Sequence, residues 1–399
     1  MRILYHHRTA ALDGMSVHIE RLVSNLRARG HEVCVVGPQA GGAGRKGDME
    51  ALVDRLRSLL PCAAFELLEL AYNIPAYRRL ARAAEQFQPD ILYERNNLFL
   101  LAGLWLRRRR RIPMLLEVNA PLAQEREQFG KLALKRLGRW TQDTVWRRAD
   151  IALPVTHVLG DMVARVRGNQ GIHVICNGGD LDEAGDRAAA AGLRMRLGLE
   201  GRIVLGFVGF VRPWHGLEWA VRALPRLPGE VHLLVVGDGP AQERLEKEAA
   251  ALGVGGRVHF AGRIPHAEIP AYVANFDVAL QTRAVAYASP LKLFEYMAMA
   301  RAIVAPDQPN LREVLTPGGD ALLFDPDSEA SFFAALQQLS NDTSLRARLG
   351  AAARNTILLR DLTWAGNARR VEELAMDQLG RESATPGVKR PGTAVHQEE

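Results

Sequence analysis

Residues 203–224 read IVLGFVGFVRPWHGLEWAVRAL, and this stretch decides the fold class. The apolar residues Ile203–Val208 are followed by Gly209, a short loop and a helical pattern over 217–224. A short apolar strand that ends in glycine and leads into a helix is typical of a β–loop–α unit in a parallel sheet. Because ligands of open parallel sheets bind beyond the carboxyl ends of the strands, the loop after Val208 is a candidate binding site.

The same strand–helix alternation runs through most of the chain and predicts an α/β protein. In the first half, strands are expected at 2–6, 32–36, 91–93, 113–118 and 149–155, with helices at 17–29, 49–60, 77–87 and 131–148. In the second half, further strands are expected at 231–236, 258–260, 278–280, 303–305 and 321–324, with helices at 241–252, 269–276, 291–300 and 311–314. Each half is therefore predicted to form a doubly wound parallel sheet.

The length of 399 residues favours two domains over one. We expect an N-terminal Rossmann-like domain over 1–180, a linker over 181–200 and a C-terminal Rossmann-like domain over 201–360. A helix over 361–378 is expected to return to the N-terminal domain. Residues 379–399 are polar and rich in residues that break helices and strands, so they are predicted to be a disordered tail.

Composition places the chain among water-soluble globular proteins, with 48% hydrophobic and 24% charged residues. The longest apolar run, over 98–106, is well short of the roughly 20 residues that a spanning helix needs. No signal peptide is visible at the start of the sequence. The odd cysteine count, with Cys34, Cys62 and Cys176 in apolar surroundings and without metal spacing, predicts buried reduced thiols. A cytoplasmic protein is therefore expected.

Positive charge is concentrated in the first half of the chain. Residues 1–180 hold 27 Lys and Arg against 18 Asp and Glu, whereas the remainder holds 24 against 27. Five consecutive arginines, from Arg107 to Arg111, follow the apolar run. They are either a solvated charged face or a contact with an anionic membrane surface, and both remain open. Nucleic-acid binding is not expected, because no aromatic residues are interleaved with the charge.

The stretch ASPLKLFEYM over 288–297 combines residues that suit a phosphate and a ribose. Ser289 is predicted to cap a helix that starts at Pro290, so that the backbone N–H groups of Leu291 and Lys292 form an anion site. Glu295 shares a helical face with Lys292 and can accept hydrogen bonds from two vicinal hydroxyls. These residues together indicate a nucleoside diphosphate. The alternative is a surface helix with a Lys–Glu pair.

The loop that follows Val208 carries two further cationic candidates, Arg212 and His215, which could flank a pyrophosphate beside Gly209. The alternative is a simple strand–loop–helix corner with a solvated Arg212 and a core Trp214.

A set of short motifs extends from the start of the chain to about residue 375. They are Gly14, His18 and Gly30-His31-Glu32-Val33; Asn177-Gly178; Val235-Val236-Gly237-Asp238-Gly239-Pro240; Val258-His259-Phe260-Ala261-Gly262-Arg263; Tyr272; Asp277; and Lys292 with Glu295-Tyr296-Met297-Ala298. Together they resemble the family 4 glycosyltransferases. The resemblance implies a GT-B fold, in which two Rossmann-like domains face each other across a cleft that holds the donor, and an enzyme that requires neither a metal nor another cofactor.

The resemblance also implies roles for individual residues. Gly14 would lie close to the donor phosphates, and Gly237 and Asp238 would lie beside the nucleoside. Arg263 would contact the base. Glu295 matches the second glutamate of the E-x7-E motif, which holds the ribose.

The sequence departs from the family pattern at three places. Tyr287 stands where the first glutamate of E-x7-E is expected, so the usual contact to donor-sugar hydroxyls is absent. The usual pyrophosphate-binding Arg and Lys are replaced by Phe210 and His215, and Lys292 and Arg212 are candidate replacements in catalysis.

The third departure concerns the histidine that commonly follows the fourth N-terminal strand. Glu117 and Asn119 lie at that place and are candidate catalytic residues, with His18 expected on the acceptor side. The variant motifs resemble a subgroup found in polysaccharide assembly.

The expected activity is retaining transfer of a hexose from a UDP- or GDP-sugar to a saccharide or lipid-linked acceptor. The enzyme is expected in the cytoplasm, with possible attachment to the inner face of the membrane. Two alternatives are a nucleotide-sugar epimerase of the same fold and an inactive nucleotide-sugar-binding subunit.

Three further motifs are set aside. Residues 42–47 match G-x-G-x-x-G, with Glu66 downstream, but they follow the second strand at a distance and indicate a glycine loop rather than a dinucleotide site. Asp180 with Asp182, and Asp325 with Asp327, match the Asp-x-Asp metal signature. Both pairs lie in predicted turns, and neither is interpreted as a metal site.

Overall fold

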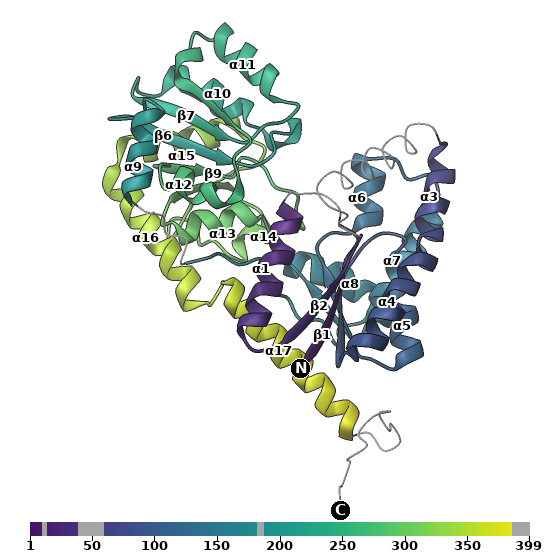
Figure 1. The fold of residues 1–399 in the computed structure, drawn as a ribbon. Helices are drawn as coiled ribbons and strands as arrows, with labels where there is room; N and C mark the ends of the chain where they lie inside the picture. Colours follow the sequence, from purple (N-terminus) through teal and green to yellow (C-terminus); the bar gives the residue numbers. More distant parts are fainter. Residues whose placement is uncertain (10–13, 39–59, 182–186, 385–399) are drawn as a thin grey trace, which may run out of the picture. The chain divides into compact units, whose positions relative to one another are not determined.

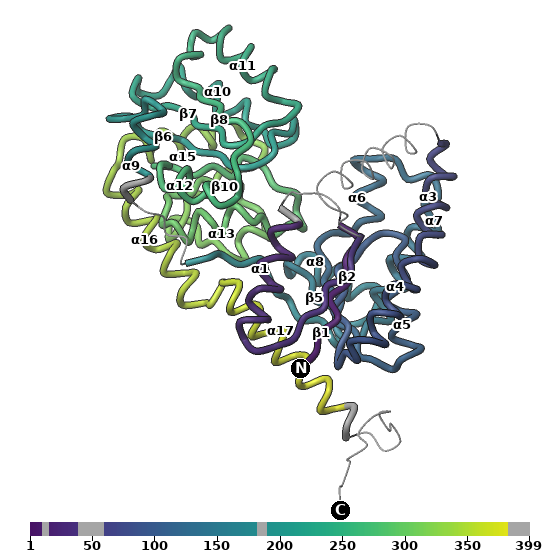
Figure 2. Tube along the Cα trace, in the orientation of Figure 1, coloured from purple at the N-terminus to yellow at the C-terminus, as the bar shows by residue number. Residues whose placement is uncertain are grey.

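We describe a computed structural model of the chain, which covers residues 1–9, 14–38, 60–181 and 187–384 (Figure 1). The chain divides into two compact units. Unit 1 comprises Met1–Leu153, Val163–His173 and Ala368–Glu399, and unit 2 comprises Pro154–Met162 and Val174–Asn367. Figure 2 shows the Cα trace of the same residues.

Unit 1 contains a five-stranded sheet in the order β2-β1-β3-β4-β5. The pairs of β1 with β2, β1 with β3 and β3 with β4 are parallel. Consecutive parallel strands need a crossover, which helices supply here. The strands are β1 (Arg2–His6), β2 (Glu32–Val36), β3 (Ile91–Arg95), β4 (Met114–Val118) and β5 (Ile151–Pro154).

The helices of unit 1 lie between these strands along the chain. Helix α4 buries Ala76, Leu80 and Ala84, which are spaced by four residues and form one apolar face. The helices are α1 (Gly14–Ala28), α3 (Cys62–Ala71), α4 (Asn73–Phe87), α5 (Ala102–Arg110), α6 (Leu122–Phe129), α7 (Lys135–Arg148) and α8 (His157–Arg167), the last of which also contributes to unit 2.

Unit 2 contains a six-stranded sheet in the order β11-β10-β9-β6-β7-β8, and its strand pairs are parallel. Counted from β6, this is the 3-2-1-4-5-6 order of a Rossmann fold. The strands are β6 (Ile203–Val208), β7 (Val231–Val236), β8 (Val258–Gly262), β9 (Val278–Leu280), β10 (Ala302–Pro306) and β11 (Leu322–Phe324).

Both faces of the unit 2 sheet are covered by helices (Figure 1). Because side chains alternate between faces, Leu205 and Phe207 pack against α10, α11 and α15, whereas Val204 and Val208 pack with residues of α12, α13 and α16. This explains why its strands are apolar throughout. The helices are α9 (Arg187–Arg196), α10 (Glu218–Ala223), α11 (Gln242–Ala251), α12 (Ile269–Val273), α13 (Leu291–Ala298), α14 (Pro309–Arg312), α15 (Glu329–Asn341) and α16 (Thr343–Leu359). The last helix, α17 (Trp364–Ala384), begins in unit 2 and belongs to unit 1 from Ala368 onward.

The predicted strands are all present, with ends within a few residues of those expected. Helices α3, α5, α6, α8, α9, α15 and α16 were not predicted as separate elements. The helix predicted over 49–60 and the glycine motif over 42–47 lie outside the described residues. The tail was predicted to begin at residue 379, which is wrong, because α17 continues to Ala384. The three cysteines are free but only half-buried.

In each unit the strand order reverses once, and this position is where open sheets bind ligands. In unit 1 the reversal falls between β1 and β3, and in unit 2 it falls between β6 and β9. Parallel strands end at the same edge of the sheet, so the residues that follow β1 and β3, or β6 and β9, share that edge. We call these two places the unit 1 edge and the unit 2 edge.

Candidate functional site

At the unit 2 edge, the loops after β6 and β7 approach each other so closely that glycine is required. A Cβ atom on Gly237 would lie 2.1 Å from the carbonyl oxygen of Gly209. Gly209 has φ +132° and Gly237 has φ +136°, which L side chains rarely adopt. The Gly209 N–H donates to the carbonyl of Val236 at 2.9 Å. The two glycines therefore let the loops meet backbone to backbone, and both remain partly exposed as a backbone surface at the strand ends.

Lys292, in the first turn of α13, reaches this surface. Its Nζ lies 3.8 Å from the ring centroid of Phe207 and 3.2 Å from the place where a Cβ atom of Gly209 would stand. The side chain is half-buried. Burial lowers the pKa of Lys292 to about 7, although the nearby Glu295 carboxylate acts in the opposite direction. Burial thus disfavours the charged form of Lys292, and a bound anion beside the glycine loops would stabilise it.

The start of α13 differs from the prediction in one respect. Pro290 is the N-cap, and the predicted cap, Ser289, does not serve as one. Ser289 is engaged elsewhere, because its hydroxyl accepts from the Asn177 N–H at 3.1 Å and its carbonyl accepts from the Asn177 side chain at 2.6 Å. Leu291 and Lys292 are the first two residues of the helix, so their N–H groups have no carbonyl one turn earlier within it.

His215 lies beside Lys292 on a short 3-10 turn, η1 (Pro213–His215). Its ring is 5.4 Å from that of Phe207, and its carbonyl accepts a hydrogen bond from the hydroxyl of Thr282, which follows β9. Burial, with help from the charges of Lys292 and Arg212, lowers the pKa of His215 to about 3. His215 is therefore neutral near pH 7 and can donate or accept a hydrogen bond without adding charge.

Arg212 and its neighbours are more exposed than the sequence predicted. The Arg212 guanidinium lies 5.1 Å from the Phe210 ring centroid and 4.9 Å from that of Trp214. Trp214 is 48% exposed and Phe210 is 45% exposed, so the alternative of a core Trp214 is wrong. The Arg212 side chain is exposed, whereas that of Lys292 is half-buried.

The remaining unit 2 candidates form two acid–base pairs at the same edge. Arg263, which follows β8, has its Nε 4.0 Å from the Asp238 carboxylate, and both side chains are exposed. The Nε2 of His266 lies 3.9 Å from the Glu295 carboxylate. The structure therefore places Asp238 next to Arg263. It adds His266, which the sequence did not indicate.

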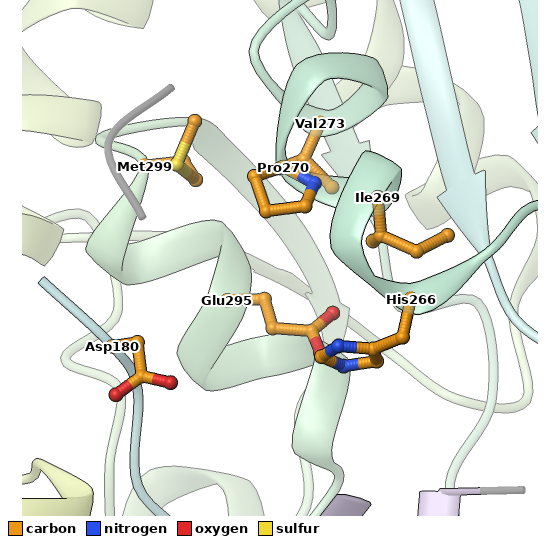
Figure 3. Close-up of a pocket in the computed structure, with 7 residues that line it drawn as sticks. All are labelled: Asp180, His266, Ile269, Pro270, Val273, Glu295 and Met299. Atoms are coloured by element: carbon orange, nitrogen blue, oxygen red, sulfur yellow. The ribbon is translucent and has the colours of Figure 1, made fainter. Parts of the chain in front are cut away.

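Glu295 and His266 line a small, open pocket, in which the Glu295 carboxylate points toward the His266 ring (Figure 3). The other walls are largely apolar. A carboxylate in the lining of a largely apolar pocket is suited to hydroxyl groups on a partly apolar ligand. The lining residues are Asp180, His266, Ile269, Pro270, Val273, Glu295 and Met299.

At the unit 1 edge, Glu117 is buried and bonded through both carboxylate oxygens. One oxygen accepts from Arg95 and from the Asn119 side chain at 2.6 Å, and the other accepts from the Tyr93 hydroxyl at 2.8 Å and lies 2.9 Å from Nε2 of His18. Burial alone would raise the pKa of Glu117, but His18, Arg95 and the hydrogen bonds hold it well below its usual range. With these four partners, Glu117 orients its neighbours.

A second buried pair adjoins Glu117. Nδ1 of His6, at the end of β1, contacts the Glu94 carboxylate at the end of β3. A Cβ atom on Gly103 would lie 2.1 Å from that carboxylate, so glycine makes the room for it. Nothing in the sequence marks His6, Glu94, Arg95 or Tyr93 as site residues, because they are far from Glu117 along the chain.

Of the other unit 1 candidates, Gly14 is the first residue of α1, and His18 lies one turn later and is buried at 6% exposure. Asn119 is half-buried, and its amide is held by Glu117. These positions allow Asn119, more readily than Glu117, to reach a ligand.

The arginine run is divided by the structure. Arg107 forms a two-pronged pair with Asp150, which also accepts from the Met114 N–H at 2.7 Å. This arginine therefore ties α5 to the sheet and does not belong to a solvated face. Arg108, Arg109 and Arg110 are exposed on α5.

The motifs set aside in the sequence have local explanations where the structure describes them. Glu66 accepts from the N–H groups of Ala133 and Leu134 at 2.8 and 2.6 Å, and it is buried. Asp325 accepts from the Asp327 N–H at 3.0 Å and forms a turn before α15. Among the described residues there is no cluster of three or more potential metal ligands. Within the same ranges, no helix is both long and apolar enough to cross a membrane.

Comparison with known proteins adds relatives for both units. Residues 12–183 match the family model described as Glycosyltransferase Family 4, and residues 202–342 match the model described as Glycosyl transferases group 1. A GDP-mannose-dependent alpha-mannosyltransferase of Mycolicibacterium smegmatis is 26% identical over 88% of this chain and 90% of its own. A lipopolysaccharide core biosynthesis glycosyltransferase of Rhizobium meliloti is 28% identical over 63% of this chain and 72% of its own.

Solved structures share the fold. HepE of Anabaena, in complex with UDP and glucose, has a TM-score of 0.73 at 19% identity, covering 94% of this chain and all of that chain. Sucrose-phosphate synthase of Thermosynechococcus elongatus has a TM-score of 0.76 at 18% identity, covering 96% of this chain and all of that one. The predicted fold class of two Rossmann-like parallel-sheet domains is confirmed. With two family models that together span most of its length, the chain belongs to the family 4 glycosyltransferases of the GT-B fold.

Proposed function

We propose that this glycosyltransferase moves a hexose from a UDP- or GDP-sugar to a saccharide or lipid-linked acceptor, with retention of configuration. The observation that carries the proposal is the position of Lys292 at the unit 2 edge, half-buried beside Gly209. A cation with a lowered pKa, next to open glycine backbone, is suited to a diphosphate. The smegmatis relative uses GDP-mannose and the Anabaena structure holds UDP, which supports this donor class.

In this proposal, different residues of unit 2 bind different parts of the donor. Lys292, the first N–H groups of α13 and Arg212 hold the diphosphate, and neutral His215 donates a hydrogen bond to it. Glu295 accepts hydrogen bonds from the ribose hydroxyls at the pocket that it lines. Asp238 and Arg263 lie toward the base.

The proposed chemistry is a front-face displacement. The bond between the anomeric carbon and the β-phosphate oxygen breaks, and the acceptor oxygen forms its bond to the same face. The acceptor proton passes to the departing phosphate oxygen. Negative charge on the diphosphate grows toward the transition state, so fixed cations stabilise this state more than the bound substrate. The step requires no protein nucleophile and, as proposed, no metal ion or other cofactor.

On the unit 1 side, we propose that Asn119 and His18, both held by Glu117, contribute to acceptor binding. The exposed Arg108, Arg109 and Arg110 would hold the enzyme on anionic lipid at the inner face of the membrane, close to a lipid-linked acceptor. Cell-surface polysaccharide or glycolipid synthesis is the process that fits these features.

The experiment that tests the proposal has two stages. UDP- and GDP-sugars are first screened for a shift in melting temperature, in excess EDTA. The stabilising donor is then supplied with a label in its sugar, together with a lipid extract and a set of oligosaccharides. Labelled glycolipid or oligosaccharide is expected. Conversion of the donor to an epimer without transfer would identify an epimerase, and binding without any turnover would identify an inactive nucleotide-sugar-binding subunit.

Chelation gives a separate prediction. Transfer should continue at full rate in excess EDTA, because Lys292 and Arg212 supply the charge that a metal ion would otherwise supply. The rate is compared with and without chelator, using the same donor and acceptor. Loss of transfer in EDTA that is restored by a divalent ion would contradict the metal-free mechanism.

A further inference from the structure

Two aromatic side chains stand exposed on either side of a cation at the unit 2 edge. Phe210 and Trp214 are 45% and 48% exposed, and the Arg212 guanidinium lies about equally far from both rings, at 5.1 and 4.9 Å. We call these three residues the aromatic clamp. Exposing aromatic rings to water is unfavourable in free energy, and exposed apolar side chains that cluster at a strand end are typical of a binding site.

The backbone holds the clamp in one geometry. Val211, between Phe210 and Arg212, is fully buried, and its N–H donates to the Asp238 carbonyl at 2.7 Å. Its carbonyl accepts from the Ala241 N–H at 3.1 Å. A Cβ atom on Gly239 would lie 2.4 Å from that carbonyl. The backbone that carries the two exposed rings is therefore held by hydrogen bonds on both sides, which lowers the ordering cost when a ligand binds.

The far end of the clamp is fixed by the 3-10 turn. The His215 N–H donates to the Arg212 carbonyl at 3.0 Å, and the His215 carbonyl accepts from the Thr282 hydroxyl. Trp214 lies between these anchors, with its ring centroid 6.3 Å from that of His215.

The chemistry of the clamp suits a pyranose ring. One face of a pyranose carries C–H groups and packs on an aromatic ring, while its hydroxyls need hydrogen-bonding partners at the ring edge. Trp214 and Phe210 keep about half of their surface exposed beside the guanidinium that lies over their rings. Arg212 has five N–H donors, which can serve a sugar hydroxyl as well as the diphosphate. A purely apolar partner would leave the guanidinium without hydrogen bonds, at a cost in free energy.

The position of the clamp near Lys292 also favours a pyranose as its ligand. The ring of His215 lies between Trp214 and Phe207, and the Lys292 ammonium lies over Phe207. The hexose of a nucleotide sugar is bonded directly to its β-phosphate, and the acceptor must reach the same carbon. A pyranose must therefore stand close to any diphosphate at Lys292.

We propose that Phe210, Arg212 and Trp214 form a saccharide subsite that binds a pyranose ring next to the donor diphosphate. This inference rests on the proposed function and extends it, because neither exposed ring has a role in holding the nucleotide. The pyranose comes either from the donor or from the acceptor, and the same variants distinguish the two.

The test uses the full chain and the variants Trp214→Ala and Trp214→Phe, with Trp140→Ala as the matched control. Trp140 is 53% exposed on α7, in unit 1. Dissociation constants are measured for UDP and UDP-glucose, and for GDP and GDP-mannose. The Michaelis constant for the acceptor is measured in the labelled-sugar transfer assay. Melting temperatures confirm that each variant is folded.

If the clamp binds the donor hexose, Trp214→Ala raises the dissociation constant of the nucleotide sugar by about 5- to 10-fold, which is the scale of one lost aromatic contact. The dissociation constant of the free nucleotide stays unchanged. If it binds the acceptor, both nucleotide constants stay unchanged and the acceptor Michaelis constant rises by about the same factor. In either case, Trp214→Phe retains most of the binding and Trp140→Ala has no effect.

Two results would overturn the inference. Equal weakening of nucleotide and nucleotide sugar would mean that Trp214 only positions Arg212 for the diphosphate. Unchanged constants in every assay would mean that the exposed rings bind no sugar. Failure of the wild-type chain to bind any nucleotide is a different outcome, since it refutes the proposed function itself.

Discussion

The two sheet edges have the same strand arrangement, but their ionisable side chains differ in burial and pairing. At the unit 1 edge, the ionisable side chains are buried and paired, with Glu117 holding four partners and Glu94 paired with His6. At the unit 2 edge, Lys292 is half-buried beside bare glycine backbone, with Arg212 exposed nearby. A paired buried network orients groups, whereas a cation beside open backbone is suited to bind an anion. The predictions below separate these two roles.

The largest effect is expected from Glu117→Gln, because it leaves Arg95 and His18 buried beside a neutral amide. Breaking a buried ion pair from one side costs about 3–5 kcal/mol, so the free energy of unfolding should fall by that amount. Urea unfolding at pH 7 measures it. Glu85→Gln, at an exposed position on α4, is the control and should change stability by less than about 0.5 kcal/mol. A fall below about 1 kcal/mol for Glu117→Gln would show that the network is not a structural unit.

Lys292→Ala should leave the fold intact and reduce turnover by about 100-fold, which is the scale of one lost contact to developing charge. The donor Michaelis constant should change less than turnover does, because the diphosphate gains charge toward the transition state. Steady-state kinetics with saturating acceptor separates the two. Lys247→Ala, at an exposed lysine of α11, is the control. If Lys292→Ala keeps near-normal turnover, Arg212 or His215 becomes the better candidate for the diphosphate.

Glu295→Gln should behave differently from Lys292→Ala, since ribose hydroxyls develop no charge during the reaction. It should weaken the binding of the free nucleotide and of the nucleotide sugar alike, by roughly 1–3 kcal/mol in binding free energy, and leave turnover at saturation nearly unchanged. Calorimetric titration of both ligands measures this. Glu268→Gln, two residues after His266 and exposed, serves as the matched control. A selective loss of turnover would move Glu295 from the ribose to the reacting centre.

The smallest effect on the fold is expected from replacing Arg108, Arg109 and Arg110 by Ser. These side chains are exposed, so melting temperature and transfer to a soluble oligosaccharide should stay within error. Binding to vesicles with anionic lipid should be lost, because each basic residue near such a surface contributes on the order of 1 kcal/mol. Sedimentation with anionic and with neutral vesicles measures this. Unaltered vesicle binding at physiological salt would show that the arginines are only a solvated face.

Much of the fold followed from local pattern. Strands such as Val231–Val236 are apolar throughout because both sheet faces are covered, and this is visible in the sequence. Helices α15 and α16 were missed as separate elements, although Ser328 and Asp342 cap them in the structure. Ser289 looked like a similar cap, but its hydroxyl bonds to Asn177, more than a hundred residues away. Local patterns cannot foresee such distant partners.

The candidate site followed the same rule. Gly209, Gly237 and Lys292 were singled out from motifs, and the structure brings them together at one edge. Tyr93 and Arg95 were not, because nothing near them in the chain marks them as partners of Glu117. The exposure of Trp214 was likewise hidden, since a tryptophan after a strand fits a core position equally well.

The central claim is that the unit 2 edge receives a diphosphate at Lys292, and proton uptake on binding tests it most directly. With its pKa lowered to about 7, free Lys292 is largely uncharged at pH 8, and a bound diphosphate raises that pKa. Binding of UDP or GDP at pH 8, titrated by calorimetry in two buffers of different ionisation enthalpy, should therefore take up close to one proton. At pH 6, where the amine is already charged, uptake at Lys292 should be small.

The same titration with Lys292→Ala should lose this uptake at pH 8, while Lys247→Ala should retain it. For the wild type, affinity should fall as the pH rises above 7, by up to about tenfold per unit while the complex stays protonated. Equal uptake in wild type and Lys292→Ala, or none in either, would contradict the assignment of the diphosphate to this lysine.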